Sequence, residues 1–146
     1  MNNIKASILI INYNNKKYIR KCINSIYDQS YNKKLEVIFH DDNSNDGSII
    51  ETNKYKNIKV IKNKSKTSFG SFNQIAAIKR SLKISKGKII FLLDSDDFFL
   101  KDKISEIVKI FDKNKSVDVV YDLPIIKNGK TLKKIKFNKK SFQRFW

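Results

Sequence analysis

Short apolar runs separated by longer amphipathic stretches organise most of the chain. The runs cover residues 6–11, 35–39, 58–61 and 88–93. Continuous apolar runs of this length are typical of parallel strands covered on both faces, because such strands need no polar side. We therefore expect four strands. The run at 88–93 is the most apolar, and we place it at the centre of the sheet.

The stretches between these runs carry helical spacing. Residues 18–27 repeat apolar positions every three to four residues, which predicts one buried helical face. Residues 49–55 predict a short helix, with Asp46 or Ser48 as its cap. A helix over residues 72–85 would bury Ile75, Ile78, Leu82 and either Ile84 or Ser85, and end at Gly87.

Past the fourth run, the pattern predicts another helix and then strands. The helix has an apolar side made by Ile104, Ile107, Val108 and Phe111. A strand is expected over residues 117–121. A hairpin is expected from 124–126 to 131–135, because Asn128-Gly129 between apolar runs is a strong turn signal. Residues 139–146 are ambiguous.

Alternation of strand and helix decides the fold class. It predicts an α/β protein with a mostly parallel sheet and helices on both faces. Right-handed crossovers make this a doubly wound, Rossmann-like sheet. A length of 146 residues is that of one domain, so residues 1–146 are expected to form a single domain.

Charge adds a second class of hypothesis. The chain holds 31 basic and 14 acidic residues, a net charge of +17. Such an excess favours nucleic acid or an anionic membrane as partner. Arg occurs only at positions 20, 80 and 144, whereas nucleic-acid surfaces rely on Arg. Peripheral attraction to an anionic membrane is therefore preferred, and nucleic acid is disfavoured.

Other features restrict the chemistry. A single cysteine, Cys22, excludes an internal disulfide, and its apolar neighbours favour a small core residue over a reactive thiol. Any histidine-based triad would have to use His40, the one histidine. The apolar runs are too short to cross a bilayer, and the N-terminus lacks the pattern of a secretory signal. We expect a cytoplasmic location, with possible attachment to the inner face of the membrane.

Three polar clusters follow strands of the predicted sheet. They are Asn12-Tyr13-Asn14, Asp41-Asp42-Asn43-Ser44 and Asp94-Ser95-Asp96-Asp97. Doubly wound sheets bind ligands at the carboxyl ends of their strands. Five carboxylates at one rim repel each other unless cations or hydrogen-bond donors balance them.

The simplest explanation for this acidic rim is a divalent cation together with a ligand that donates hydrogen bonds. Asp94 and Asp96 could hold Mg²⁺ or Mn²⁺, with water and phosphate oxygens completing the shell. Two structural alternatives stay open. Asp94 or Ser95 could cap the next helix, and the cluster from Asp42 to Ser44 could be only a turn.

Four segments, in this order and at this spacing, point to a known family. They are residues 7–14 (SILIINYN), 18–26 with 29–31 (YIRKCINSI and QSY), 35–48 (LEVIFHDDNSNDGS) and 87–97 (GKIIFLLDSDD). They resemble the opening strand and loop, the first helix and its exit, the second strand with its acidic loop, and the metal-motif strand of family 2 glycosyltransferases. The resemblance covers about residues 6–115.

The resemblance implies a GT-A fold and an inverting transfer of sugar from a nucleoside-diphosphate sugar, with a UDP-sugar as the expected donor. It assigns Asp94 and Asp96 to a Mg²⁺ or Mn²⁺ ion, with Asp94 also near the ribose and sugar. Residues assigned to nucleotide-sugar binding are Ile11, Asn12, Tyr13, Asp41, Asp42, Gln74, Lys79, Asp94 and Ser95. The expected acceptor is a glycan or a lipid-linked glycan.

Departures from the family pattern leave alternatives. Ile11 stands where proline is common, and Lys79 where asparagine is frequent. The family's catalytic base lies downstream of the metal motif, and neither Asp118 nor Asp122 has the expected context, so no base is assigned. The chain is then either an enzyme or a nucleotide-sugar-binding module that lacks the C-terminal acceptor-binding part. The aromatic end, with Phe145 and Trp146, is a candidate interface for a partner subunit or a second copy.

Overall fold

A computed structural model describes residues 4–31, 34–64, 67–128 and 131–134. The chain divides into two compact units, Met1–Lys109 and Ile110–Trp146. The first holds the acidic clusters and is described first. No helix in the described ranges is both long and apolar enough to cross a membrane.

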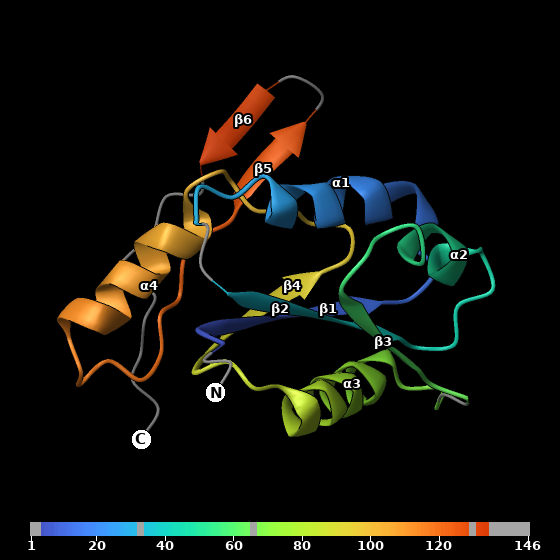
Figure 1. The fold of residues 1–146 in the computed structure, drawn as a ribbon. Coiled ribbons are helices and arrows are strands. Elements are labelled where there is room, and N and C mark those ends of the chain that lie inside the picture. Colours follow the sequence, from blue (N-terminus) through green and yellow to red (C-terminus); the bar gives the residue numbers. More distant parts are fainter. Residues whose placement is uncertain (1–3, 32–33, 65–66, 129–130, 135–146) are drawn as a thin grey trace. The chain divides into compact units, whose positions relative to one another are not determined.

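The first unit is built on a four-stranded parallel sheet (Figure 1). Its strands are β1 (Ala6–Asn12), β2 (Leu35–Asp41), β3 (Ile58–Lys62) and β4 (Ile89–Asp94), in the order β3-β2-β1-β4. The pairing is in register from one end to the other, from Ala6 opposite Leu35 to Asn12 opposite Asp41. The predicted α/β class and mostly parallel sheet are confirmed.

The predicted place of β4 is wrong. Within the described residues β4 is an edge strand, and β1 lies between β2 and β4. Phe91 and Leu93 are buried on one face of β4, but Leu92 on the other face is 57% exposed. An apolar run identifies a strand, but it does not say which neighbours pair with that strand.

Helices cover opposite faces of this sheet (Figure 1). On one side lies α1 (Lys16–Tyr27), which buries Ile19, Cys22, Ile23 and Ile26 as its spacing predicts. On the other side lies α3 (Gly70–Ile84), which packs on β1 and β2. The short α2 (Ser48–Thr52) packs against α1.

The buried face of α3 differs from the predicted one. Its buried residues are Asn73, Ala77 and Ser81, spaced one turn apart. By contrast, Ile75, Leu82 and Ile84 are exposed, and Ile78 is half-buried. Small side chains allow the helix axis to approach the sheet closely, so the face with the smaller residues packs inward.

Gly87 also has a different role from the predicted helix cap. The helix ends at Ile84, and Ser85 is already extended. A Cβ at Gly87 would lie 2.4 Å from backbone atoms of Ala6 and Ser7, so only glycine fits against β1. Close approach, and not a left-handed turn, requires this glycine.

The N-cap of α2 is Gly47, and not the predicted Asp46 or Ser48. Asp46, just before it, accepts a hydrogen bond from the backbone N–H of Ser48 at 2.9 Å. A fourth helix, α4 (Lys103–Lys113), buries Ile104 and Val108 as predicted.

The second unit contains an antiparallel hairpin of β5 (Ile125–Asn128) and β6 (Thr131–Lys134). The predicted hairpin is confirmed, while its turn and residue 135 lie outside the described residues. No strand forms over residues 117–121, which is a correction. Val119 and Tyr121 are exposed there, so the apolar pattern meets no partner strand in the described part. Residues 139–146, including Phe145 and Trp146, lie outside the described ranges.

Candidate functional site

The carboxyl ends of β1, β2 and β4 meet at one rim of the sheet. Backbone hydrogen bonds join their loops there: the Ser95 N–H donates to the Ile11 carbonyl at 3.1 Å, and the Asp42 N–H donates to the Asn12 carbonyl at 2.8 Å. The three polar clusters therefore come together as the topology predicts.

Asn12 and Asp41 form the buried base of this rim. The Asn12 side chain donates to Asp41 Oδ1 at 2.8 Å and to Ser44 Oγ at 3.0 Å. Asp41 Oδ2 accepts the backbone N–H of Ser44 at 2.8 Å, and the Asp41 side chain is fully buried. Both residues hold the two loops together.

Tyr13 and Asp42 follow Asn12 and Asp41 in their loops. Tyr13 is exposed beside the rim, whereas Asp42 is only 7% exposed. Asp42 Oδ1 accepts a hydrogen bond from the Asn63 side chain, which follows β3, at 2.9 Å. Asn14 and Asn43 adopt positive φ angles of 51° and 61°, a conformation that asparagine tolerates better than most residues. These two turns let both loops fold back over the rim.

The third cluster forms a tight turn. The Asp97 N–H donates to the Asp94 carbonyl at 3.0 Å, which closes the turn over Ser95 and Asp96. Ser95 is buried, and its Oγ accepts from the Asn15 side chain at 3.0 Å. With Ser95 anchored inside, the side chains of Asp94 and Asp96 on either side of it are exposed.

The carboxylates of this turn affect the pKa values of groups beside them. Burial, and then the charges of Asp96 and Asp94, raise the pKa of Asp97. Burial raises the pKa of the Cys22 thiol to about 12, and Asp97, Asp96 and Asp94 add to that effect. Cys22 is fully buried, as expected of a small core residue. The carboxylates of the turn repel one another, and a bound cation would relieve that repulsion.

The donor set fits an open metal site. Asp94 and Asp96 offer exposed carboxylate oxygens, which suit a hard divalent cation. Nowhere in the described ranges do three or more His, Cys, Asp or Glu side chains come together in a metal-binding group. Two carboxylates are enough only if water and ligand phosphates complete the coordination shell, as Mg²⁺ prefers.

Of the two candidates on α3, only Gln74 reaches this rim. Its Nε2 donates to Asp94 Oδ1 at 3.1 Å. Lys79 follows five residues later, so its side chain leaves the helix roughly 140° around the axis from Gln74. Lys79 is exposed on the outer side of α3.

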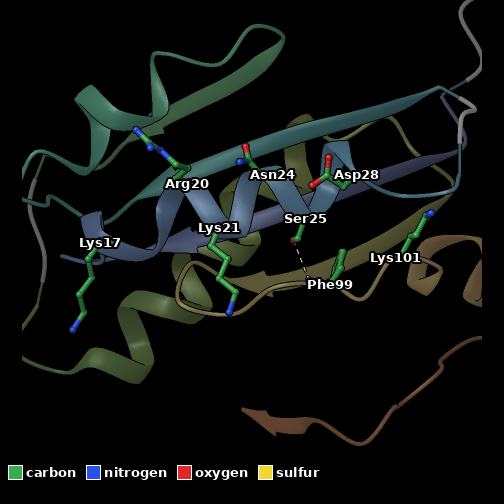
Figure 2. A pocket seen from close by; sticks show the side chains of 8 residues that line it. All are labelled: Lys17, Arg20, Lys21, Asn24, Ser25, Asp28, Phe99 and Lys101. Carbon is green, nitrogen blue, oxygen red and sulfur yellow. Dashed lines mark hydrogen bonds between the residues drawn. The ribbon is translucent and has the colours of Figure 1, made fainter. Parts of the chain in front are cut away.

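Two open hollows lie along α1, and neither is lined by Asp41, Asp42, Asp94 or Asp96. The first has a volume of about 820 Å³ and is shown in Figure 2. The loop after β4 forms one wall, where the Phe99 N–H donates to Ser25 Oγ at 3.0 Å. The lining residues are Lys17, Arg20, Lys21, Asn24, Ser25, Asp28, Phe99 and Lys101. The second, about 600 Å³, is lined by Asn14, Lys16, Lys17, Arg20, Asp46 and Glu51.

Sequence reasoning missed the residues that position the site. Ser44, Asn63 and Asn15 each hold one of the predicted residues through a side-chain hydrogen bond. The only signal for them was their place in loops rich in asparagine and serine, which favour such local bonds. The loop before α3 is held in the same way by Asn73, whose Nδ2 donates to the Thr67 carbonyl at 2.9 Å.

A doubly wound sheet with acidic and amide side chains at its carboxyl rim places this chain among the α/β proteins that bind their ligands at that edge. Comparison with known proteins then gives the family. The model of "Glycosyl transferase family 2" matches residues 7–145, and the chain belongs to this family.

Relatives agree with this assignment. The chain is 36% identical over 110 residues to the Escherichia coli UDP-Glc:alpha-D-GlcNAc-diphosphoundecaprenol beta-1,3-glucosyltransferase WfaP, covering 75% of this chain and 42% of WfaP. An uncharacterized glycosyltransferase of Nostoc is 30% identical over 135 residues, which is 88% of this chain and 40% of the relative. The chain therefore spans about two fifths of the length of these relatives.

Solved structures share the fold. The structure of residues 1–349 of Staphylococcus aureus TarS matches with a TM-score of 0.66 and 28% identity, over 75% of this chain and 33% of that one. The mannosyltransferase PcManGT of Pyrobaculum calidifontis matches with a TM-score of 0.65 and 20% identity, over 75% of this chain and 32% of that one. The expected GT-A fold is confirmed by these neighbours.

Proposed function

We propose that this chain is the donor-binding part of an inverting glycosyltransferase that uses a nucleoside-diphosphate sugar. The observation that carries the proposal is the Asp94–Asp97 turn. It exposes two carboxylates beside Gln74, at the rim where the loops of Asn12 and Asp42 converge. We take the reaction class from the family and propose the residues from their place at the rim.

A UDP-sugar is the donor we favour. WfaP is named for UDP-Glc, and TarS has been solved with UDP and with UDP-GlcNAc. PcManGT, which shares only the fold, was solved with GDP-Man and Mn²⁺. The two UDP proteins are nearer in sequence to this chain.

Residue roles follow from the geometry of the rim. Tyr13 and Asp42 contact the base and ribose, with Ile11 beside them in the same loop. Asn12 and Asp41 act indirectly by fixing that loop, because their side chains are buried and hydrogen-bonded to each other. Lys79, on the outer side of α3, has the weakest structural support among the proposed donor-binding residues.

Asp94 and Asp96 would hold the divalent cation, Mg²⁺ or Mn²⁺. When bound, this ion would neutralise the negative charge that develops on the departing diphosphate. Gln74 orients the Asp94 carboxylate through its 3.1 Å hydrogen bond, and buried Ser95 fixes the turn. Asp94 also lies toward the ribose and sugar in this assignment.

A donor-binding module without independent transfer is the second candidate. Its support is that no residue of this chain is assigned as catalytic base. Under either candidate, the acceptor is a glycan or a lipid-linked glycan. A cytoplasmic location and a partner or second copy at the C-terminal end belong to the same proposal.

The test is calorimetric titration of the chain with UDP, UDP-glucose, UDP-GlcNAc and GDP-mannose, with and without Mn²⁺. We expect metal-dependent binding of the UDP ligands that Asp96→Asn abolishes. Asp28→Asn is the matched control, since Asp28 is an exposed aspartate at the end of α1. Failure of all four nucleotides to bind would reject both candidates. Donor binding without turnover in an acceptor screen would favour the module.

A further inference from the structure

The outer side of α3 exposes an unusual set of apolar side chains. Phe72 is 66% exposed, Ile75 52% and Leu82 41%. At 100° per residue these three lie within about 80° of one another, on the side of α3 opposite its buried residues. Phe69, just before the helix, is also exposed and packs edge-on against Phe72 with ring centroids 5.9 Å apart.

Cations are interleaved with this apolar stripe. Lys79 and Lys83 lie on the same side of the helix and are exposed. We call Phe69, Phe72, Ile75, Leu82, Lys79 and Lys83 together the α3 outer face. Exposed apolar side chains bordered by lysines suit an anionic lipid interface, because burial of apolar area and attraction to anionic lipids both strengthen binding there.

We propose that the α3 outer face docks on an anionic lipid surface. Phe72, Ile75 and Leu82 enter the boundary between head groups and acyl chains, and the cations bind lipid phosphates. The flexible stems of Lys79 and Lys83 allow their ammonium groups to reach the head groups while the apolar side chains stay below. The net charge of +17 adds long-range attraction.

A second copy of the chain is a poorer occupant. A symmetric dimer would use the same basic face on both copies and would bring their lysines into one contact. Like charges at a desolvated contact oppose association, and the whole chain is strongly basic. An anionic surface satisfies both the apolar and the basic part of the face.

Docking here has a consequence for the proposed reaction. Gln74, in the first turns of α3, bonds to Asp94 at the acidic rim. A membrane bound along α3 therefore lies near that rim, where a lipid-linked acceptor would need to arrive. This consequence rests on the proposed function, whereas the docking itself does not.

The test is sedimentation of the whole chain with vesicles of phosphatidylglycerol mixed with phosphatidylcholine, and with vesicles of phosphatidylcholine alone. We expect binding to the anionic vesicles only. The triple variant Phe72→Gln/Ile75→Gln/Leu82→Gln should weaken it by about tenfold or more, since each side chain adds apolar burial. Its donor binding and circular dichroism should stay as in the wild type, which separates this result from a failure of the proposed site.

A matched charge control uses α1, on the other face of the sheet (Figure 1). Lys83→Gln should weaken vesicle binding more than Lys17→Gln does, although both remove one exposed lysine. Absence of vesicle binding overturns the proposal, and so does binding that survives the triple variant. Dimers of the wild type that the triple variant dissolves would assign the face to a second copy instead, which also overturns it.

Discussion

The helices on the two faces of the sheet use their apolar residues in opposite ways. The α1 helix buries Ile19, Ile23 and Ile26 and exposes its lysines, as an amphipathic helix of a globular domain should. The α3 helix buries Asn73, Ala77 and Ser81 and exposes larger apolar side chains. Helical spacing therefore shows which residues share a face of a helix. Side-chain size and local hydrogen bonds decide which of its faces packs on the sheet.

The largest expected difference in stability is between substitution of a buried isoleucine of α1 and substitution of an exposed isoleucine of α3. Ile23 is fully buried and Ile75 is half exposed. We expect Ile23→Ala to lower the free energy of unfolding by about 2–5 kcal/mol, because it removes packed atoms and leaves a cavity. Ile75→Ala should change it by no more than about 0.5 kcal/mol. Urea unfolding followed by circular dichroism measures both.

Equal losses in the two variants would contradict the comparison. They would mean that Ile75 packs against something in solution, and that the α3 outer face is covered by part of the chain itself. Lost vesicle binding by Ile75→Ala with unchanged stability would instead sharpen the contrast between the two helices.

A smaller effect should come from enlarging the inward face of α3. Ala77 is fully buried, whereas its neighbour Ala76 is only half-buried. Ala77→Leu should destabilise by about 1–3 kcal/mol, since the added atoms must push the helix from the sheet. Ala76→Leu, with the same added volume, should be close to neutral. The same urea titration compares the pair, and a tolerated Ala77→Leu would show that α3 is not closely packed there.

Much of the fold followed from local pattern. The four parallel strands, the α1 face, the hairpin and the meeting of three polar loops at one rim were all predicted. Each depends on neighbours in sequence or on the fixed direction of parallel strands. The position of β4 and the inward face of α3 depend on which distant surfaces are available, and the local pattern of apolar residues does not contain that information.

The rim was predicted in the same partial way. Residue type and position brought Asp94, Asp96 and Asp42 to it, but sequence could not divide exposed side chains from buried ones that hold the loops. In the structure Asp41, Asn12 and Asp42 are buried and hydrogen-bonded, while Asp94 and Asp96 are exposed. Gln74 reaches the rim and Lys79 does not, because five residues along a helix rotate the side-chain direction by roughly 140°.

The smallest effect concerns His40, on β2. Its side chain is fully buried, and neither ring nitrogen has a hydrogen-bond partner among the described residues. Burial, and then the charge of Arg80 on α3, lower the pKa of His40, although Asp42 and Asp41 act in the other direction. The folded state therefore favours the neutral ring, and unfolding takes up a proton at acidic pH.

The lowered pKa of His40 makes the folded protein less stable as the pH falls. Above the ordinary pKa of 6.5, His40 is neutral in both states and its titration changes nothing. As pH falls from 6.5 toward the lowered pKa of the folded protein, the unfolded state gains protons and the free energy of unfolding decreases. His40→Leu should remove this loss, and should add about 1 kcal/mol at neutral pH by replacing unpartnered buried nitrogens.

Urea titrations of wild type and His40→Leu at a series of pH values from neutral to about pH 5 measure the difference, within the acidic range where His titrates. The advantage of the variant should grow as pH falls. A constant difference would mean that the ring is neutral in both states over this range or protonated equally in both. An advantage that shrinks at low pH would show that Asp41 and Asp42 dominate the ring and that folding favours its charged form. That result would mean that the carboxylates of the acidic rim control the charge of His40. The interior between α3 and the sheet would then be more polar than its packing indicates.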